Sequence, residues 1–500
     1  MADKKFIAFD IGAESGRCVV ARLSNNKISL NEVHRFPTYN IKYINGFYWD
    51  ILAIYKEIII GLTNAQKKFG NEFESIGIDT WAVDYVLIDA EGRILGYPYH
   101  YRDDRTEFMM DKAFQNLSQE KIYEKTGIQF AQFNTIFQLL SEKYRKLDFL
   151  NFADKMLLIP DFLNYMLTGI KKSEYTNAST TSLVDLHTKN WSWELIDAFN
   201  FPRRIFPEIV EPGIEIGMLL PSIAEQTGLS KNISITAAAS HDTASAVVSV
   251  PALDSNWAYL SSGTWSLIGV ELSGPAVTPE AMRYNFTNEG GYNNTIRFLK
   301  NIIGLWPLQE CRRYWKEKSQ VYSYSELVSL ACDYGFADAW VDLKDIRFLK
   351  SDEMPEKIRK YLIETGQIAK PDIGFITRVI LESLAFSYKT AIDEIQTVTG
   401  KKINTLHVVG GGIKNELLMQ LTADALDCYI IAGPVEGAIV GNIGVQAIAS
   451  GAIPDIRALR MITAGSFQLK KYEPKNLDYF LKNERNYKSI LNQDYNAGRA

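Results

Sequence analysis

One stretch decides the fold of this chain: Phe6-Ile7-Ala8-Phe9-Asp10-Ile11-Gly12-Ala13-Glu14-Ser15-Gly16-Arg17. The apolar run 6–9 predicts a short buried strand that ends on the carboxylate of Asp10. Gly12 and Gly16 permit a tight turn, because glycine tolerates positive φ and lets other groups approach closely. Residues 17–23 then predict a return strand, and residues 27–36 predict a third.

The turn between the first two strands has the composition of a phosphate site. Its backbone N–H groups and the Ser15 hydroxyl can face phosphate oxygens, and Asp10 can hold a hydrated Mg²⁺. It is not a P-loop, since it lacks GxxxxGK[ST] and leads into a strand rather than a helix. A structural hairpin without a ligand is the alternative interpretation.

A second stretch far downstream repeats this pattern, from Trp257 to Glu271. Residues 12–15 align with residues 263–266, each after an apolar run and before a return strand. A repeat at this distance predicts two similar domains, each presenting one phosphate turn to a shared cleft. The repeat therefore favours the phosphate interpretation over a plain hairpin.

The stretch 233–247 can carry proton transfer. A strand runs into small residues, presents His241-Asp242-Thr243, and then enters an alanine-rich helix. Asp242 lies near the N-terminus of that helix, which favours the ionised carboxylate. Asp242 either caps the helix or acts as a general base. The two phosphate turns favour the base.

Several further segments leave two interpretations open. Asp79 and Asp84 flank Ala82 at a break between strands, either as turn-capping residues or in a ligand loop at a strand's carboxyl end. The patch 101–106 is either surface charge or the frame of a polyol site. The triple glycine 410–412, between a strand and the N-cap Asn415, is either a tight turn or a flat surface for a nucleotide. Residues 298–305 predict an amphipathic helix, on which Asn301 is either solvated or faces the ligand.

Length and composition place the chain in a broad class. Five hundred residues exceed one core, so two or three domains are expected. A net charge of −5 argues against nucleic acid or an anionic membrane as the main partner. The four cysteines are widely spaced, and the first residues lack a signal peptide, which predicts reduced thiols in a cytoplasmic protein. No apolar run reaches the ~18 residues needed to span a bilayer.

Five strings, in this order and over nearly the whole chain, resemble the FGGY family of carbohydrate kinases. They are DIGAESGR (10–17), GIDTWAVDY (77–85), SHDTAS (240–245), SSGTWSL (261–267) and RFLKNIIGLW (297–306). Most relatives carry a DxGT turn, so Ala13-Glu14 points to the branch of the family that phosphorylates L-rhamnulose. The resemblance implies a two-domain actin-like α/β ATPase, with duplicated ribonuclease H-like domains and the active site in the interdomain cleft.

The resemblance also implies roles for individual residues. ATP would be bound by Ala13, Glu14, Ser15, Gly16, Arg17, Thr264, Gln309 and Gly411. The sugar would be contacted by Ala82, His241, Asp242, Thr243 and Asn301, with Asp242 as the catalytic base and Asp10 near the metal. Ala82 stands where relatives often have glycine, and its extra methyl group puts the fine substrate preference in doubt.

The implied reaction is ATP-dependent phosphorylation of L-rhamnulose at its C1 hydroxyl, with Mg²⁺. The alternatives are a kinase for another ketose, L-fuculose or L-xylulose, and a non-metabolic ATPase switch of the same fold group. The expected domains are 1–250 for the sugar, the first phosphate turn and the catalytic aspartate, 251–455 for the nucleotide, and 456–500 as a helical tail. The sequence does not decide between a monomer and a homodimer.

Overall fold

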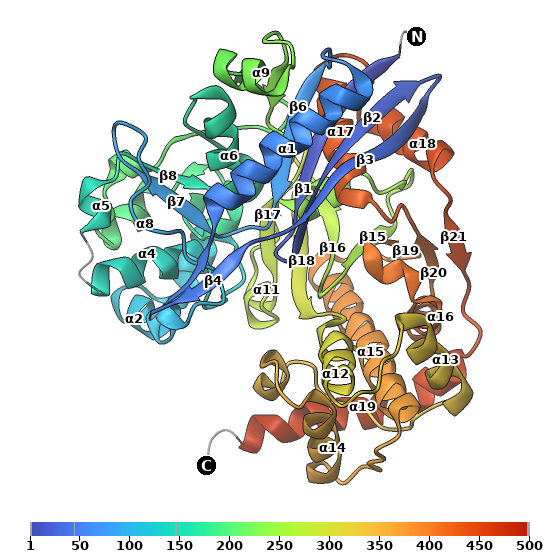
Figure 1. The fold of residues 1–500 in the computed structure, drawn as a ribbon. Coiled ribbons are helices and arrows are strands. Elements are labelled where there is room, and N and C mark those ends of the chain that lie inside the picture. The colour runs from blue at the N-terminus through green and yellow to red at the C-terminus, as the bar shows by residue number, and fades with distance from the viewer. Residues whose placement is uncertain (1–2, 45, 146–147, 498–500) are drawn as a thin grey trace. The chain divides into compact units, whose positions relative to one another are not determined.

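A computed structural model describes residues 3–44, 46–145 and 148–497 (Figure 1). The chain folds into two compact units. The first unit consists of Met1–Leu253, Glu271–Phe298 and Gly437–Phe467, and the second of Asp254–Val270, Leu299–Glu436 and Gln468–Ala500. The boundaries expected from the sequence, 1–250, 251–455 and 456–500, remain a prediction, because compactness alone does not assign function.

The first unit is built on a six-stranded mixed sheet with the order β13-β14-β6-β1-β2-β3. β1 runs antiparallel to β2 and parallel to β6, β6 runs parallel to β14, and β14 runs antiparallel to β13. The bounds of these strands are β1 Lys4–Ile11, β2 Ser15–Ser24, β3 Lys27–Pro37, β6 Ser75–Thr80, β13 Glu215–Met218 and β14 Ser234–Thr236.

Alternation along β1 explains why helices cover both faces of this sheet. Ile7 and Phe9 belong to the core that contains α1 (Ile51–Phe69), whereas Phe6 and Ala8 belong to the core that contains α17 (Gly437–Ala449). Successive side chains of a strand point to opposite faces, so a strand that is apolar throughout needs a layer on each side. Figure 1 shows α1 lying across one face of β1 and β2.

Shorter elements complete the first unit. The strands are β4 Asn40–Tyr43, β5 Gly46–Trp49, β7 Tyr85–Ile88, β8 Lys155–Leu158, β9 Lys172–Glu174, β10 Val184–Asp185, β11 Asn190–Trp191, β12 Glu208–Val210 and β17 Thr287–Gly290. The helices are α2 Met109–Asn116, α3 Gln119–Thr126, α4 Thr135–Tyr144, α5 Phe149–Phe152, α6 Ile159–Thr168, α7 Tyr175–Ala178, α8 Trp193–Ala198, α9 Pro221–Thr227, α10 Asp242–Val248, α11 Pro279–Arg283 and α18 Ile456–Ser466.

The second unit repeats the topology of the first. Its strands belong to a seven-stranded sheet with the order β17-β18-β16-β15-β19-β20-β21, in which β15 runs antiparallel to β16 and parallel to β19. β19 runs parallel to β20, which runs antiparallel to β21. Strand for strand, β15, β16, β19, β20 and β21 have the directions of β1, β2, β6, β14 and β13. The duplication expected from the sequence is therefore present in the fold.

The elements of the second unit surround one long buried helix, α15, which runs from Ile373 to Thr399. Asp372 caps its N-terminus and Gly400, at φ 66°, ends it. The strands are β15 Trp257–Ser262, β16 Trp265–Leu272, β18 Ile296–Ile303, β19 Thr405–Val409, β20 Tyr429–Ala432 and β21 Lys470–Tyr472. Residues 271–272 of β16 and 296–298 of β18 belong to the first unit. The other helices are α12 Trp306–Glu317, α13 Tyr324–Tyr334, α14 Met354–Glu364, α16 Glu416–Leu426 and α19 Leu477–Ala497.

Two predictions of secondary structure were wrong. Residues 298–305 were expected to form an amphipathic helix, but residues 296–303 form strand β18 and helix α12 begins only at Trp306. All but one residue of β18 is buried, and an apolar run buried on both faces matches helical spacing by coincidence. Lys470–Tyr472, expected to be helical, forms the edge strand β21.

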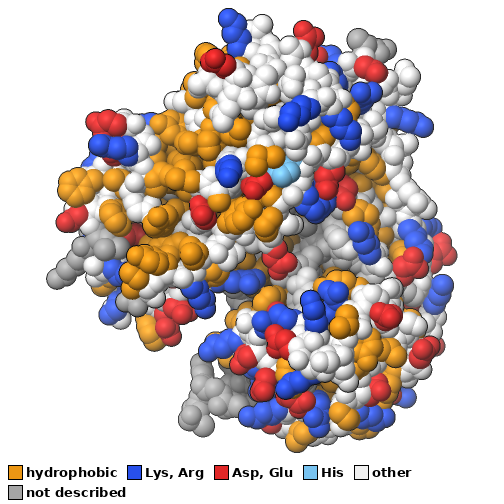
Figure 2. Space-filling model, in the orientation of Figure 1, with side chains coloured by type: hydrophobic (Ala, Val, Ile, Leu, Met, Phe, Trp, Pro, Cys, Tyr) orange, Lys and Arg blue, Asp and Glu red, His pale blue; other side chains and the backbone are white. Residues whose placement is uncertain are grey.

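Exposed apolar side chains gather on part of the first unit (Figure 2). Four exposed aromatic residues of this unit are Tyr43, Tyr97, Phe108 and Phe152. The hairpin of β4 and β5 is a two-stranded sheet, and all four residues of β4 are exposed. No helix among the described residues is long and apolar enough to cross a membrane.

Candidate active site

The first predicted phosphate turn joins β1 to β2. Ile11 pairs with Gly16, and the Gly12 N–H donates to the Ser15 carbonyl at 3.0 Å, so four residues form the turn. Gly16 must lack a side chain, because a Cβ there would lie 2.3 Å from the Phe36 ring. Thr38 anchors the turn by donating its hydroxyl to the Gly12 carbonyl at 2.6 Å. Glu14 and Ser15 are exposed, so this loop is firmly held yet open to a ligand.

Asp10 and Arg17 face each other at the base of this turn. They are register partners on β1 and β2, and Arg17 donates from Nε and Nη2 to Asp10 Oδ2, at 3.1 and 2.7 Å. The predicted metal ligand and a predicted phosphate ligand are thus paired with each other. If Mg²⁺ binds near Asp10 and a phosphate binds at Arg17, the ion pair between these two side chains would be replaced. Asp10 would then face the cation, and Arg17 would face the phosphate.

Three carboxylates interact near the ends of the parallel strands. Asp79 on β6 is the register partner of Asp10, and burial followed by the Asp10 charge raises the pKa of Asp79 well above its usual value. Asn442 donates to Asp79 Oδ2 at 2.6 Å, whereas Oδ1 is buried and has no hydrogen-bond partner among the described residues. Burial also raises the pKa of Asp242, and the Asp10 charge adds to that effect.

This cluster of negative charge fits a divalent cation held by few protein ligands. The negative charge of Asp10 contributes to the raised pKa of both Asp79 and Asp242, and a cation that neutralises this charge would stabilise their ionised forms. Within residues 3–44, 46–145 and 148–497, no three His, Cys, Asp or Glu side chains are arranged as a closed metal site. Mg²⁺ commonly keeps several waters and binds through one or two carboxylates plus substrate phosphates, which this arrangement allows.

Asp242 is the first residue of α10, as expected, and its side chain retains 34% of its surface exposed. The Thr243 hydroxyl donates to Asp242 Oδ1 at 3.0 Å, which fixes the carboxylate. The sequence suggested that the helix N-terminus favours the ionised form. Burial and the Asp10 charge act in the opposite direction and raise the pKa of Asp242. A carboxylate with a raised pKa and one open side can accept a proton.

His241 precedes Asp242 and lies in a buried cluster of charge. Its Nε2 lies 3.5 Å from Asp242 Oδ1, and its Nδ1 lies 3.3 Å from Glu289 Oε2 and 3.2 Å from Arg297 Nη2. Glu289 and Arg297 are themselves 3.0 Å apart, and their side chains are 6% and 0% exposed. Burial opposes ionisation of Glu289, but the neighbouring Arg297 cation outweighs it and lowers the pKa of Glu289.

The predicted sugar-contacting Ala82 lies in the loop between β6 and β7. Val83 next to it adopts φ 69°, a conformation that a β-branched residue rarely takes. Its carbonyl accepts hydrogen bonds from Thr135 Oγ1 at 2.7 Å and Gln138 Nε2 at 3.2 Å. Thr80 links the loop to the His241 segment, since its N–H donates to the Ser240 carbonyl at 2.9 Å.

Asp84 holds this loop from below. Oδ2 accepts from Trp49 Nε1 at 2.6 Å, Trp81 Nε1 at 3.0 Å and the Tyr101 N–H at 3.0 Å. Oδ1 accepts from Gln138 Nε2 at 2.9 Å. Burial raises the pKa of Asp84 to about 6, although these donors oppose the shift. Asp84 is therefore a buried brace for the loop, and of the two interpretations of its position the structural one fits its contacts.

The charged patch 101–106 is not surface charge throughout. The side chain of Arg105 is 3% exposed and donates to Gln138 Oε1 at 2.7 Å. Asp103 is 7% exposed and accepts from the Phe47 N–H at 2.7 Å. Arg105 and Asp103 support the elements around the Ala82 loop.

Glu174 is a site residue that the sequence did not indicate. It is fully buried, and its Oε2 accepts from the Ser240 N–H at 3.1 Å and from Ser240 Oγ at 2.6 Å. It also caps α7 through the Thr176 and Asn177 N–H groups. Glu174 thereby fixes the backbone just before His241. No local sequence pattern indicates this role of Glu174, because Glu174 and Ser240 are 66 residues apart in the chain.

The second predicted phosphate turn lies in the second unit, between β15 and β16. Ser262 pairs with Ser266, and the Gly263 N–H donates to the Trp265 carbonyl at 2.9 Å. This turn has three residues where the first has four, so Ser15 corresponds in its hydrogen bond to Trp265, and the alignment of Ser15 with Ser266 was wrong. Gly304 braces the turn, since its N–H donates to the Thr264 carbonyl at 3.1 Å.

The triple glycine packs against the same strand end. A Cβ on Gly412 would lie 2.0 Å from Ser262 Oγ, and one on Gly410 would lie 2.8 Å from the Ser262 carbonyl. A Cβ on Gly411, by contrast, would meet nothing within 4 Å, so this predicted nucleotide contact faces open space. Gln309, on α12 after the Gly304 brace, has a buried Oε1 with no hydrogen-bond partner among the described residues.

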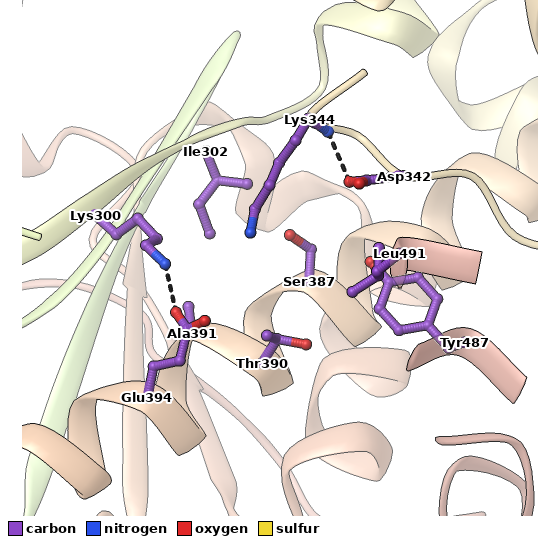
Figure 3. A pocket seen from close by; sticks show the side chains of 10 residues that line it. All are labelled: Lys300, Ile302, Asp342, Lys344, Ser387, Thr390, Ala391, Glu394, Tyr487 and Leu491. Atoms are coloured by element: carbon purple, nitrogen blue, oxygen red, sulfur yellow. Dashed lines mark hydrogen bonds and ion pairs between the residues drawn. The ribbon is translucent and has the colours of Figure 1, made fainter. Parts of the chain in front are cut away.

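The remaining predicted contact, Asn301, lies on β18 rather than on a helix and is partly exposed. A pocket in the second unit is lined by Lys300 and Ile302, the sequence neighbours of Asn301, but not by Asn301 itself (Figure 3). Lys300 pairs with Glu394 there, and burial lowers the pKa of Lys300. None of the predicted site residues lines this pocket.

The site residues thus fall into two groups. The first unit holds the first turn, Asp10, the Ala82 loop and the His241–Thr243 segment, which are linked by strand register and by the bond from Thr80 to Ser240. The second unit holds the second turn, Gln309, Gly411 and Asn301. Each group contains one of the two predicted phosphate turns together with open polar positions.

Comparisons with known proteins identify the family of this chain. The N-terminal domain model of the FGGY family of carbohydrate kinases matches residues 5–249, and the C-terminal domain model matches residues 258–450. A rhamnulokinase from Halalkalibacterium halodurans is 44% identical over 93% of this chain and 98% of its own length. One from Bacteroides thetaiotaomicron is 42% identical, over 95% of this chain and 96% of its own length.

Solved structures show the same fold at lower identity. A gluconate kinase from Lactobacillus acidophilus has a TM-score of 0.82 at 18% identity, with 98% of each chain covered. A Plasmodium falciparum glycerol kinase with ADP has a TM-score of 0.78 at 16% identity, covering 100% of this chain and 99% of its own. The predicted actin-like, duplicated α/β fold is confirmed, and the chain is a sugar kinase that belongs to the FGGY family of carbohydrate kinases.

Proposed function

We propose that this kinase transfers the γ-phosphoryl group of ATP to the C1 hydroxyl of L-rhamnulose. The observation that carries the proposal is the partly open Asp242 carboxylate, fixed by Thr243 beside the buried His241. Relatives named rhamnulokinase, 41–44% identical over at least 93% of the chain, support the choice of ketose. The product would be L-rhamnulose 1-phosphate, as in L-rhamnose catabolism.

In this mechanism, Asp242 orients the C1 hydroxyl and accepts its proton as the new O–P bond forms. A carboxylate is too weak a base to ionise an alcohol beforehand, so proton transfer accompanies bond formation. The raised pKa of Asp242 makes it a stronger base than an exposed aspartate. His241, Thr243, Ala82 and Asn301 contact the sugar, and the Ala82 loop is held in place before the sugar binds.

Phosphoryl transfer depends mainly on alignment and on neutralising charge. The turn residues Ala13 to Gly16 and Arg17 face the phosphates of ATP, and Thr264 supplies the second turn. Gln309 and Gly411 bind the nucleotide, where an unpartnered amide oxygen and an open glycine support such a contact. Mg²⁺ near Asp10 would neutralise phosphate charge when bound.

We assign the sugar, the first phosphate turn and the base to residues 1–250, the nucleotide to 251–455, and a supporting tail to 456–500. Glu289 and Arg297, which contact His241, join the sugar-binding side. The alternative substrates are L-fuculose and L-xylulose. These two ketoses remain candidates because Ala82, next to the strained Val83, carries a methyl group at a position where relatives often have glycine.

The test is a steady-state comparison of ketoses. ATP turnover is measured with L-rhamnulose, L-fuculose and L-xylulose, and without sugar. The proposal expects the highest kcat/KM with L-rhamnulose and little ATP turnover without a ketose. A higher kcat/KM for another ketose would make that ketose the assigned substrate. ATP turnover that does not depend on sugar would favour an ATPase switch.

A further inference from the structure

His241 has two ring nitrogens in different surroundings, and their partners decide where its proton lies. Nε2 faces Asp242 Oδ1 at 3.5 Å, toward the partly open side. Nδ1 faces the interior, where Arg297 Nη2 lies at 3.2 Å and Glu289 Oε2 at 3.3 Å. The charged groups around the ring are thus Asp242 on α10, Glu289 on β17 and Arg297 on β18.

The chemistry of arginine settles the direction of the inner hydrogen bond. A guanidinium group has only donors, so in its contact with Nδ1 the arginine donates and Nδ1 accepts. Glu289 Oε2 lies within ion-pair distance of both neighbours but has no hydrogen bond of good geometry among the described residues. The Nδ1 lone pair is therefore occupied, and the proton of a neutral ring lies on Nε2.

Arg297 is held in this orientation by two other contacts. Its Nε donates to the Gly290 carbonyl at 2.8 Å, and Glu289 offsets its charge at 3.0 Å. Gly290 is fixed in turn, because its N–H donates to Ser179 Oγ at 2.8 Å and a Cβ there would lie 2.5 Å from the Tyr175 ring. A fully buried ion pair contributes little net stability, so these contacts are better explained by the orientation that they impose.

We propose that Arg297, oriented by Glu289, fixes His241 as the Nε2–H tautomer, so that His241 donates a hydrogen bond to a ketose oxygen next to Asp242. Arg297 and Glu289 are positioning residues, and His241 is the residue that touches the substrate. A second proton on the ring would have to occupy Nδ1, directly against the Arg297 cation. His241 therefore serves as a donor, and Asp242 remains the base.

This inference rests on the proposed function only in placing a ketose at Nε2. The tautomer itself can be read without any sugar, from long-range ¹H–¹⁵N spectra of protein labelled at histidine. The chain has five histidines, so His241→Gln identifies the signals of that ring. In the wild type, we expect Nε2 protonated and Nδ1 unprotonated at neutral pH. Protonation of Nδ1, with or without Nε2, overturns the proposal.

Arg297→Met tests the positioning step. We expect the proton to move to Nδ1, facing Glu289, and KM for the ketose to rise about tenfold through loss of one hydrogen bond, with a smaller change in kcat and in KM for ATP. Arg297→Lys, which retains a donor, should restore the Nε2–H tautomer in part. An unchanged tautomer in Arg297→Met contradicts the proposal.

The matched control is Arg460→Met, which breaks another largely buried ion pair of the same unit, to Glu271 at 2.7 Å. It should alter neither the His241 tautomer nor the KM for the ketose, and the same shift in both variants contradicts a specific role of Arg297. If Arg297→Met does not fold, the double variant Arg297→Met/Glu289→Gln removes both charges of the buried pair together. The wild-type spectrum tests the predicted tautomer without any variant of Arg297. Failure of the ketose assay with the expected tautomer would overturn the proposed substrate alone.

Discussion

Two requirements meet at Asp242. Burial raises the pKa of its carboxyl group, which strengthens it as a base, whereas catalysis requires the ionised form. Its side chain keeps 34% of its surface exposed, and the hydrogen bonds from Thr243 oppose the effect of burial on its pKa. The position therefore combines basicity with access for a substrate hydroxyl.

Replacement of Asp242 by Asn should lower kcat by about 10²–10⁴-fold, the usual contribution of a positioned base, with little change in ketose binding. Asp50→Asn at the N-cap of α1 is the control, because Asn also caps helices well. Turnover and ketose affinity are measured for both. Near-normal turnover in Asp242→Asn would place the base elsewhere, with Asp79 as the next candidate.

Asp84 predicts a pH dependence of stability. Its folded pKa of about 6 lies above the usual 3.8, so the folded protein binds this proton more tightly than the unfolded chain does. The stability that this provides is complete below pH ~4, falls as the pH rises to about 6, and is absent above; the upper limit is about 3 kcal/mol. Thermal unfolding of Asp84→Asn between pH 4 and 7 should lack this decline. Parallel curves for the variant and the wild type would contradict the assignment.

At the scale of elements, the packing of α17 against α10 holds in place the helix that begins with Asp242. A Cβ on Gly441 of α17 would lie 1.7 Å from the Ser245 carbonyl oxygen on α10, the helix that begins with Asp242. Contacts this close leave no room for a methyl group. The small residues of α17, among them Gly441 and Gly444, permit this close packing.

Gly441→Ala should therefore lower both the melting temperature and turnover, with an overpacking cost of about 1–3 kcal/mol. Gly465→Ala on α18 is the matched control, since a Cβ there meets nothing within 4 Å. Alanine is favoured over glycine in helices by roughly 0.5–1 kcal/mol, so the control should be neutral or more stable. Equal melting temperatures for the two variants would mean that α17 and α10 separate without cost.

The second turn gives a prediction about the nucleotide. Thr264→Val removes one hydroxyl from this turn but keeps the backbone bonds from Gly304 and Trp306 to the Thr264 carbonyl. We expect a higher KM for ATP and unchanged ketose affinity without ATP. Thr397→Val, at an exposed position of α15, is the control. Loss of ketose binding in Thr264→Val would assign this turn to the sugar.

Short-range patterns were predicted well from the sequence, and long-range partners were not. The strands on each side of both turns and the N-cap at Asn415 all depend on nearby residues. Strand β18 was read as a helix because neighbours bury both of its faces. The contacts of Glu174 with Ser240 and of Arg297 with His241 join segments more than 50 residues apart, which no local pattern reveals.

At the scale of the whole molecule, the same sheet topology occurs twice, and each copy places a turn between its first two strands. The sequence predicted this duplication from the repeated turns alone. It did not predict that residues 271–298 and 437–467 pack with the first unit, since assignment to a compact unit depends on tertiary contacts. The segment 271–298 carries Glu289 and Arg297, and both side chains contact His241 in the first unit.

The identity of the phosphorylated atom tests the central claim most directly. The protein is incubated with ATP, Mg²⁺ and L-rhamnulose labelled with ¹³C at C1, and the products are followed by ³¹P NMR. The account predicts one new phosphate ester whose phosphorus couples to the labelled carbon, formed in equal amount with ADP and only when the ketose is present. An ester without that coupling, or ADP released as fast without the ketose, would contradict it.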